Sequence, residues 1–281
     1  DGSDDLWENG EPVKREGYLT EMIAEKAVSF VERNAASPFF LYVPFNAVHN
    51  PMDPPEKYIA PFAPMKDEKR RKFAAMLTAL DSGVGSILGK LNEHDLTNNT
   101  LVIFISDNGG PTAQTTSNNG PLRGFKTQVL EGGIRVPFMM QWPGHIRPDQ
   151  TYSEPVISLD ILPTIVAAAG GELVASDKCD GSDLVPYLAL NDSKPHNALF
   201  WRQGENFAIR SGKFKFVKQT GEPLALYDLS QDIHEDHNLI AQMPDKANEL
   251  QSVWNQWNAD NIDPLWERRD RQPQRERAVT R

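Results

Sequence analysis

The apolar run LVIFI at positions 101–105 leads directly into the polar sequence SDNGG at positions 106–110. A short apolar run that ends at turn-forming residues is typical of a buried β-strand. In open α/β sheets, ligands bind beyond the carboxyl ends of the strands. The sequence therefore places Asp107 and Asn108 where a ligand of such a sheet is expected. The two glycines that follow allow a sharp turn and a close approach of the backbone to a ligand.

The side chains of Asp107 and Asn108 supply hard oxygen ligands, one charged and one neutral. Such oxygens suit Ca²⁺ or Mg²⁺ better than zinc, and no cluster of cysteine or histidine residues in the sequence competes with them. Asp-Asn-Gly is also a frequent turn sequence, and on the local sequence alone a plain turn is the simpler interpretation. Both interpretations are open at this point.

Helical and extended patterns alternate along the first two thirds of the chain. Apolar residues recur at helical spacing over 19–31 and 73–91, and SLDILPTIVAAAGG at 158–171 predicts a further helix with Ser158 as its N-cap. Continuous apolar runs predict strands at 39–45, 101–105 and 134–142, the first of them buried on both faces. This alternation predicts an α/β fold with a mostly parallel sheet.

The pattern changes near Asn191. Four short runs, ALFWR, FAIRS, KFKFV and ALYDL, are separated by turns that contain glycine, and they predict an antiparallel meander. A helix is expected from Pro244 to Trp257, and the arginine-rich end of the chain predicts a solvated tail. We therefore expect an α/β part at 1–190, an antiparallel subdomain at 191–265 and a charged tail at 266–281.

Four other side chains are weaker candidates for a site. His49 follows the predicted strand 39–45, so it should reach the same sheet edge as Asp107, although a histidine near prolines is more often a hydrogen-bonded loop residue. Lys126, in LRGFKTQVLEGG, is by default a solvated lysine. Trp201 and Arg202 are candidates for a substrate subsite, but a core tryptophan beside a surface arginine is the more ordinary arrangement.

Composition excludes several classes of protein. The net charge of −10 does not support nucleic-acid binding. No apolar run approaches the ~18–20 residues that a membrane span requires. The single cysteine, Cys179, excludes an intrachain disulfide and has the neighbours of an inert thiol. The first residues, DGSDDLWENG, resemble neither an initiator sequence nor a signal peptide, so we expect residue 1 to lie inside a longer protein.

Taken together, the segments resemble those of the type I, formylglycine-dependent sulfatases, in particular the arylsulfatases. PFFLYVPFNAVHNP resembles the strand–histidine segment of that family, ISDNGG its metal segment, and PLRGFKTQVLEGGIRVPFMMQWPG its lysine segment. The sequences SLDILPTIVAAAG, FAIRSGKFKFV and LYDLSQDIHEDHNL follow in the family's order. The resemblance implies an alkaline-phosphatase-like mixed sheet sandwiched by helices, with a small C-terminal antiparallel sheet and helix.

The resemblance also implies roles for single residues. Asp107 and Asn108 are then ligands of a divalent cation, Ca²⁺ rather than Mg²⁺. Lys126 binds the sulfate oxygens, and His49 contacts the sulfate or the ester oxygen and assists departure of the alcohol. In the family, a hydrated formylglycine oxygen attacks sulfur, the alcohol leaves, and the sulfo-enzyme then releases sulfate. The implied substrates are sulfated carbohydrates or aryl sulfates, and the implied location is exported, periplasmic or extracellular, or lysosomal.

The chain departs from the family's pattern at the nucleophile. The family generates formylglycine within a C/S-x-P-x-R segment, and these 281 residues contain none. The family's paired aspartate ligands and GKxH-like segment, which come from the same front part, are missing as well. We therefore expect this chain alone to be inactive and to bind calcium poorly. Its expected partner is the N-terminal portion that carries formylglycine, or a second copy in a homodimer.

Two alternatives to a sulfatase are considered. A phosphodiesterase or phosphonate hydrolase of the same superfamily is the nearest enzyme, but those commonly carry histidine where Asn108 stands, so Asn108 favours sulfate esters and a hard cation. A non-catalytic remnant that binds anions or carbohydrates is the other alternative. Weak binding of sulfated ligands without turnover would support the remnant.

Overall fold

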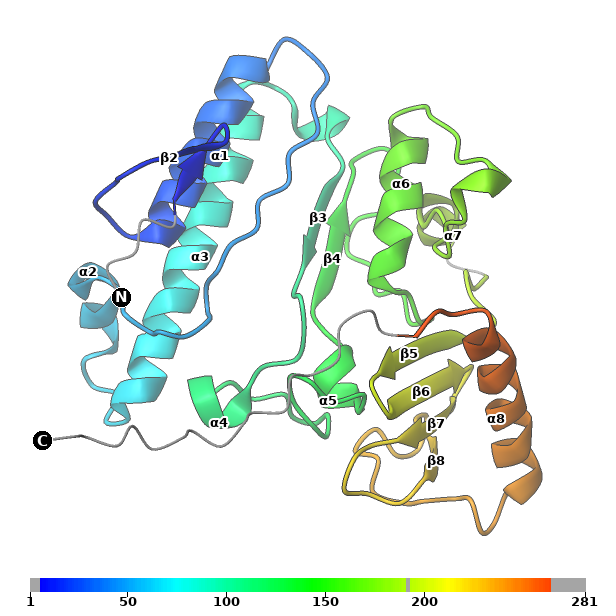
Figure 1. The fold of residues 1–281 in the computed structure, drawn as a ribbon. Helices are drawn as coiled ribbons and strands as arrows, with labels where there is room; N and C mark the ends of the chain where they lie inside the picture. The colour runs from blue at the N-terminus through cyan, green and yellow to red at the C-terminus, as the bar shows by residue number, and fades with distance from the viewer. Residues whose placement is uncertain (1–5, 191–192, 264–281) are drawn as a thin grey trace, which may run out of the picture. The chain divides into compact units, whose positions relative to one another are not determined.

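A computed structural model describes residues 6–190 and 193–263. These residues form two compact units, of which one reaches to Asn197 and the other begins at Ala198. Figure 1 shows the elements of each unit. The predicted charged tail at 266–281 lies outside the described residues.

Two long helices, α1 (Leu19–Asn34) and α3 (Glu68–Glu93), pack along each other in the first unit (Figure 1). Small side chains are frequent among their buried residues, including Ala24 and Ala27 on α1 and Ala79 on α3. Small residues let two helix backbones approach closely, and both helices cover the ranges predicted from their periodicity. At the start of α3, the side chain of Asp67 accepts the Arg70 N–H at 3.0 Å and caps the helix.

The longer of the two two-stranded sheets in the first unit consists of β3 (Val102–Ile105) and β4 (Phe138–Gln141), which pair antiparallel. The other is a short antiparallel pairing within residues 7–12. The prediction of a mostly parallel sheet is therefore wrong for the part of the chain that the structure describes, although the α/β class is confirmed. The predicted strand 134–142 also begins later than expected. Its first residue instead ends α5 (Glu131–Ile134), a single helical turn that contains two glycines.

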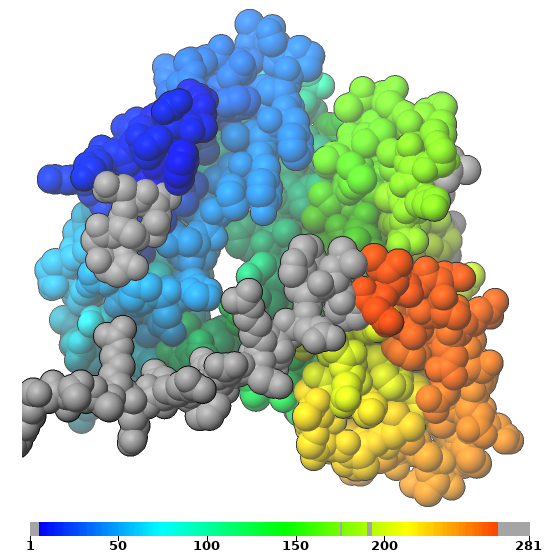
Figure 2. Space-filling model, in the orientation of Figure 1, coloured from blue at the N-terminus to red at the C-terminus, as the bar shows by residue number. Residues whose placement is uncertain are grey.

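Residues 39–45 form no ladder with any strand of the described chain, so the predicted strand is wrong as well. Half-buried and exposed side chains alternate along this segment, and the blue N-terminal part of the chain to which it belongs lies at the surface in Figure 2. Phe40 is 70% and Tyr42 75% exposed. An extended chain becomes a strand only when a neighbour supplies hydrogen bonds, and the apolar run alone carries no information about that neighbour.

The predicted helix 158–171 is present but shorter, as η3 (Ser158–Asp160) followed by α6 (Ile161–Ala168). Its capping side chain is not Ser158. Oδ2 of the fully buried Asp160 accepts the Ile157 N–H at 2.8 Å, and Oδ1 accepts from the Ser182 N–H and from Nε2 of His196, each at 2.8 Å. This carboxylate therefore ties the start of the helix to the chain that follows it.

The remaining elements of the first unit are short. They are β1 (Trp7–Glu8), β2 (Glu11–Pro12), α2 (Glu56–Ile59), η1 (Ala60–Phe62), η2 (Thr97–Asn99), α4 (Thr112–Thr115), η4 (Ala175–Asp177) and α7 (Val185–Leu190). No helix in the described ranges combines the length and apolarity that crossing a lipid bilayer requires.

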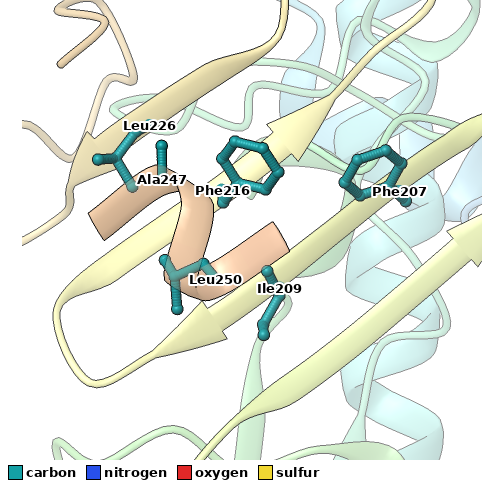
Figure 3. Close-up of a cluster of buried hydrophobic side chains, with 6 residues drawn as sticks. All are labelled: Phe207, Ile209, Phe216, Leu226, Ala247 and Leu250. Carbon is teal, nitrogen blue, oxygen red and sulfur yellow. The ribbon is translucent and has the colours of Figure 1, made fainter. Parts of the chain in front are cut away.

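The second unit is the predicted antiparallel meander with one helix. Strands β5 (Leu199–Gln203), β6 (Asn206–Ser211), β7 (Phe214–Lys218) and β8 (Ala225–Asp228) pair in sequence order, and α8 (Pro244–Ala259) packs on the sheet. Their common core is a cluster of buried apolar side chains (Figure 3). It contains Phe207, Ile209, Phe216, Leu226, Ala247 and Leu250.

One buried ion pair lies in this second unit. Nζ of Lys215 on β7 lies 2.8 Å from Oε1 of Glu235, and both side chains are 0% exposed. Charges removed from water in this way are tolerated only when they are paired. Glu235 is thereby held against the sheet, although it belongs to the segment between β8 and α8.

Candidate active site

His49 and Lys126, two of the candidate residues, meet in the structure. Nζ of Lys126 lies 3.2 Å from Nε2 of His49, and Nδ1 of His49 lies 2.7 Å from the carbonyl oxygen of Asn50. A carbonyl only accepts, so Nδ1 carries the proton and Nε2 holds the lone pair that accepts from the lysine ammonium. The contact therefore assigns the Nδ1–H tautomer of His49 and leaves Nε2 as its reactive nitrogen.

Asp107 and Asn108 follow the carboxyl end of β3, the position predicted for ligand binding. Asp107 is exposed, and its Oδ1 accepts the backbone N–H of Asn108 at 2.8 Å. Nδ2 of Asn108 donates to the carbonyl oxygen of Gly109 at 3.0 Å. Because the amide nitrogen is engaged in this way, the amide oxygen is the end of Asn108 that can face a cation.

This donor set fits a hard cation but supplies only part of its coordination. The described residues contain no group of three or more His, Cys, Asp or Glu side chains that could hold a metal ion. Ca²⁺ takes 6–8 oxygen ligands, whereas Asp107 and Asn108 supply carboxylate and amide oxygens from two adjacent positions. The pair can therefore form one side of a calcium site, and the other ligands must come from elsewhere.

A close backbone contact joins the loop after β3 to the segment after Lys126. The Gly109 N–H donates to the carbonyl oxygen of Gly133 at 2.9 Å. A Cβ added at Gly109 would lie 1.7 Å from the carbonyl oxygen of Gly132, so no other residue fits without moving the backbone. Gly109 of ISDNGG is therefore required because the two backbones touch there.

Two residues that sequence reasoning missed hold the Lys126 loop. Oδ1 of Asn119 accepts the Gly110 N–H at 2.9 Å, and its Nδ2 donates to the carbonyls of Gly110 and Gly124. Gln128 closes the turn around Lys126, because its Oε1 accepts the Phe125 N–H at 3.1 Å. The sequence signal for both is slight, since each is one amide side chain in a polar loop.

The His49 loop and α3 both reach the short helix α4 that follows the Asp107 loop. Nδ2 of Asn50 lies 3.4 Å from the carbonyl oxygen of Gln114. From α3, the side chains of Lys69 and Arg70 donate to the carbonyls of Ala113 and Thr116 at 3.0 and 2.7 Å. The segment that includes α4 therefore links the parts of the chain that carry the candidate site residues.

The other sequence candidates do not gain a role. Arg202 donates to the Asp263 carboxylate at 3.0 Å within the second unit, and Trp201 is half-buried on β5. The thiol of Cys179 is free and half-buried. A structural role is therefore a simpler interpretation of Trp201 and Arg202 than a substrate subsite.

The chain belongs to the sulfatase family. The family model described as Sulfatase matches residues 2–171, and that described as N-sulphoglucosamine sulphohydrolase, C-terminal, matches residues 125–260. Arylsulfatase A of Bos taurus is 34% identical over 247 residues, which cover 77% of this chain and 47% of that protein. A sulfatase of Formosa agariphila is 32% identical over 262 residues, 81% of this chain and 47% of that protein.

Solved structures agree with the family and the fold. The crystal structure of Ps i-CgsB in complex with k-i-k-neocarrahexaose has a TM-score of 0.86 and 32% identity, and the match covers 92% of this chain and 58% of that chain. The phosphonate monoester hydrolase SpPMH from Silicibacter pomeroyi, at 18% identity and a TM-score of 0.60, shares the fold. The chain spans about half the length of the curated relatives it matches.

Proposed function

We propose that these 281 residues provide the sulfate-binding side of a calcium-dependent sulfatase that hydrolyses sulfate esters of carbohydrates. The observation that carries this proposal is the contact of Lys126 with Nε2 of His49. A cationic group beside a proton-transferring nitrogen suits a reaction in which negative charge spreads over oxygens while an alcohol departs. Membership of the sulfatase family supports the same reaction.

The two side chains have separable tasks. The ammonium of Lys126 donates to Nε2 of His49 in the free protein, and it can turn to a sulfate oxygen when substrate is bound. Nδ1 of His49 stays on the Asn50 carbonyl, so Nε2 is the nitrogen that faces the departing alcohol. Nε2 holds a lone pair in the free protein, so it must first take a proton, from the Lys126 ammonium or from water, and can then pass that proton to the alcohol. The Asn50 carbonyl therefore orients the ring in the way that an acceptor orients a catalytic histidine.

Asp107 and Asn108 are proposed to hold the cation. Bound there, Ca²⁺ would supply positive charge that stabilises the sulfate oxygens during transfer. Asp107 contributes the charged ligand and Asn108 the neutral one, both at the end of β3. A carboxylate and a carboxamide favour Ca²⁺ or Mg²⁺ over zinc, and Ca²⁺ is the cation that the resemblance to sulfatases implies.

The nucleophile is proposed to come from polypeptide outside the 281 residues. No C/S-x-P-x-R segment occurs in this sequence, and the matched relatives are about twice as long. We expect the formylglycine, the remaining cation ligands and the second lysine–histidine pair to lie in that polypeptide. The 281 residues alone should then bind sulfate weakly and hydrolyse no ester.

A sulfated carbohydrate is the proposed substrate class. The oligosaccharide bound by Ps i-CgsB supports a sugar rather than a simple aryl sulfate. An exported or lysosomal location would accord with such a substrate. Hydrolysis of a phosphonate monoester is the alternative, because SpPMH shares the fold. Asn108 disfavours it, because such hydrolases commonly carry histidine at that position.

The test is to assay the native polypeptide that contains this chain for sulfate release. Sulfated oligosaccharides, 4-nitrophenyl sulfate and a phosphonate monoester are compared, each with calcium and with a chelator. We expect calcium-dependent release of sulfate and none from the 281 residues alone. Faster turnover of the phosphonate would favour the alternative, and sulfated-ligand binding without any turnover would favour the non-catalytic remnant.

A further inference from the structure

We propose that Asn119 is a positioning residue that fixes Lys126 relative to Asp107 and Asn108. The inference rests on the proposed function, because it assumes that these three side chains act on one ligand. It starts from a residue outside both the Lys126–His49 pair and the Asp107–Asn108 pair. The Asn119 side chain bonds the backbone on both sides of the candidate site.

The Asn119 amide uses its acceptor and its donor together. Oδ1 accepts the Gly110 N–H at 2.9 Å, and Nδ2 donates to the Gly110 carbonyl at 2.9 Å and to the Gly124 carbonyl at 3.1 Å. Paired donation and acceptance with one residue reproduces the contact that a neighbouring strand would make. Asn119 therefore serves Gly110 as a backbone partner while holding Gly124 at the same time.

The two glycines that Asn119 joins are close in sequence to the candidate site residues. Gly110 is two positions after Asn108, and Gly124 is two positions before Lys126. Both glycines lie in close-packed surroundings. A Cβ at Gly110 would lie 2.2 Å from Oγ of Ser117, and Gly124 has a φ of +94° with Leu130 packed against it. Because the Asn119 side chain bonds both glycines, we expect a change at Asn119 to affect both loops.

Only a carboxamide of this length meets the geometry. Aspartate would keep the acceptor for the Gly110 N–H but would turn a carboxylate oxygen towards two carbonyl oxygens, and leucine would leave three polar backbone groups without their partner. Asn118 provides a matched comparison. It is exposed, and its Oδ1 accepts only the local Gly120 N–H, at 2.8 Å.

The first measurement uses the unsubstituted chain. Both Nδ2 hydrogens of Asn119 are engaged, so we expect its side-chain amide to exchange with solvent at least tenfold more slowly than that of Asn118, as measured by ¹⁵N NMR. Equal exchange for the two amides would overturn the proposal. This comparison needs no variant, so it tests the hydrogen bonds of Asn119 even if a substitution unfolds the protein.

The second measurement follows the site in Asn119→Ala, Asn119→Asp and the control Asn118→Ala. We expect the ¹⁵N signals of the His49 ring and of the Lys126 ammonium to move in both Asn119 variants and to stay in place in the control. Signals from β5–β8 should stay in place in all three variants. Unchanged His49 and Lys126 signals in a folded Asn119 variant would overturn the proposal.

The third measurement is turnover by the native polypeptide. A misplaced Lys126 still attracts sulfate, so Asn119→Ala should lower kcat by about tenfold to a hundredfold with a smaller change in KM. A loss of stability with unchanged kcat would reduce Asn119 to a structural role and overturn the proposal. Absence of sulfatase activity in the unsubstituted polypeptide would instead remove the proposed function, and the NMR comparisons would still decide the positioning.

Discussion

Lys126 donates to Nε2 of His49 across 77 positions of sequence. Neither residue lies in a regular helix or strand, so the contact depends on the loops that carry them. The His49 loop reaches α4 through Asn50, and the Lys126 loop reaches the end of β3 through Asn119. The geometry of the pair is therefore set by hydrogen bonds to loop backbone.

The leaving group should report the role of His49. In the native polypeptide, His49→Ala should lower kcat/KM about 100-fold or more for a sugar sulfate, because its alcohol needs a proton to depart. The loss should be much smaller for 4-nitrophenyl sulfate, whose leaving group is stable as an anion. Lys126→Ala should slow both substrates alike, because it removes charge from the sulfate itself.

Equal losses for the two esters in His49→Ala would contradict proton donation and leave His49 only a binding role. Lys66→Ala, which changes an exposed lysine on the segment before α3, is the control and should leave kcat/KM unchanged.

Calcium binding should depend on Asp107. Isothermal titration of the 281 residues with Ca²⁺ should give weak binding at best, and Asp107→Asn should abolish it, because the charged oxygen of the partial site is lost. In the native polypeptide, the same substitution should raise the calcium concentration needed for half-maximal activity at least tenfold. Asp95→Asn changes another exposed aspartate and should have no effect. Unaltered calcium dependence in Asp107→Asn would exclude Asp107 as a ligand.

Gly109 should tolerate no side chain. Gly109→Ala places a Cβ 1.7 Å from the Gly132 carbonyl oxygen, so the two loops must separate. We expect a loss of about 3 kcal/mol in the free energy of unfolding, measured by urea denaturation. Gly85→Ala is the control, because nothing lies within 4 Å of its added Cβ and it sits on the exposed side of α3. That control should raise stability by about 0.5–1 kcal/mol, and a neutral Gly109→Ala would contradict the close contact.

The buried ion pair of the second unit should be far more costly to break than to replace. Lys215→Met leaves the Glu235 carboxylate buried without its cation and should lower stability by about 3–5 kcal/mol. The double variant Lys215→Met/Glu235→Leu should recover most of that loss, as denaturant unfolding of each variant can measure. Additive losses in the double variant would show that the two charges do not stabilise each other.

Acid should weaken the contact between α1 and α2. Hydrogen bonding by Lys57, aided by Tyr58, lowers the pKa of Glu21 from its ordinary value of 4.5 despite partial burial. A lowered pKa in the folded state contributes stability above the ordinary pKa, and this stability is lost as the pH falls through the folded value. Tyr58→Phe removes a 2.8 Å hydrogen bond to Glu21 and should cost about 1 kcal/mol at pH 7.

Glu21→Gln should flatten the dependence of unfolding on pH as the pH falls from above 4.5 through the lowered pKa of Glu21. If Glu21→Gln keeps the slope of the unsubstituted protein, Glu21 is not the titrating group.

Sequence patterns predicted the helices and strands that depend mainly on nearby residues. The helices α1 and α3 follow from apolar periodicity, and the β5–β8 meander follows from short runs between glycine turns. The strand predicted at 39–45 was wrong because a ladder depends on a neighbour that the run does not encode. The start of β4 was placed too early because the glycines in α5 gave no helical signal.

The sequence named the candidate reactive side chains but not the residues that support them. The resemblance to sulfatases named His49 and Lys126, and the structure brings them together. Asn119 and Gln128 were missed because an amide in a polar loop gives the same sequence signal whether it faces water or backbone. Their roles depend on distances between loops that are remote in sequence.

The hydrogen bonds from Asn119 to Gly110 join the two ends of the segment 111–118. Other contacts to this segment, from Lys69 and Arg70, end on backbone carbonyls and are indifferent to the side chains it carries. Loop closure costs little more as a loop lengthens. Residues 111–118 are thus pinched together at their base, so the exposed side chains of this loop can vary without undoing the closure that Asn119 makes.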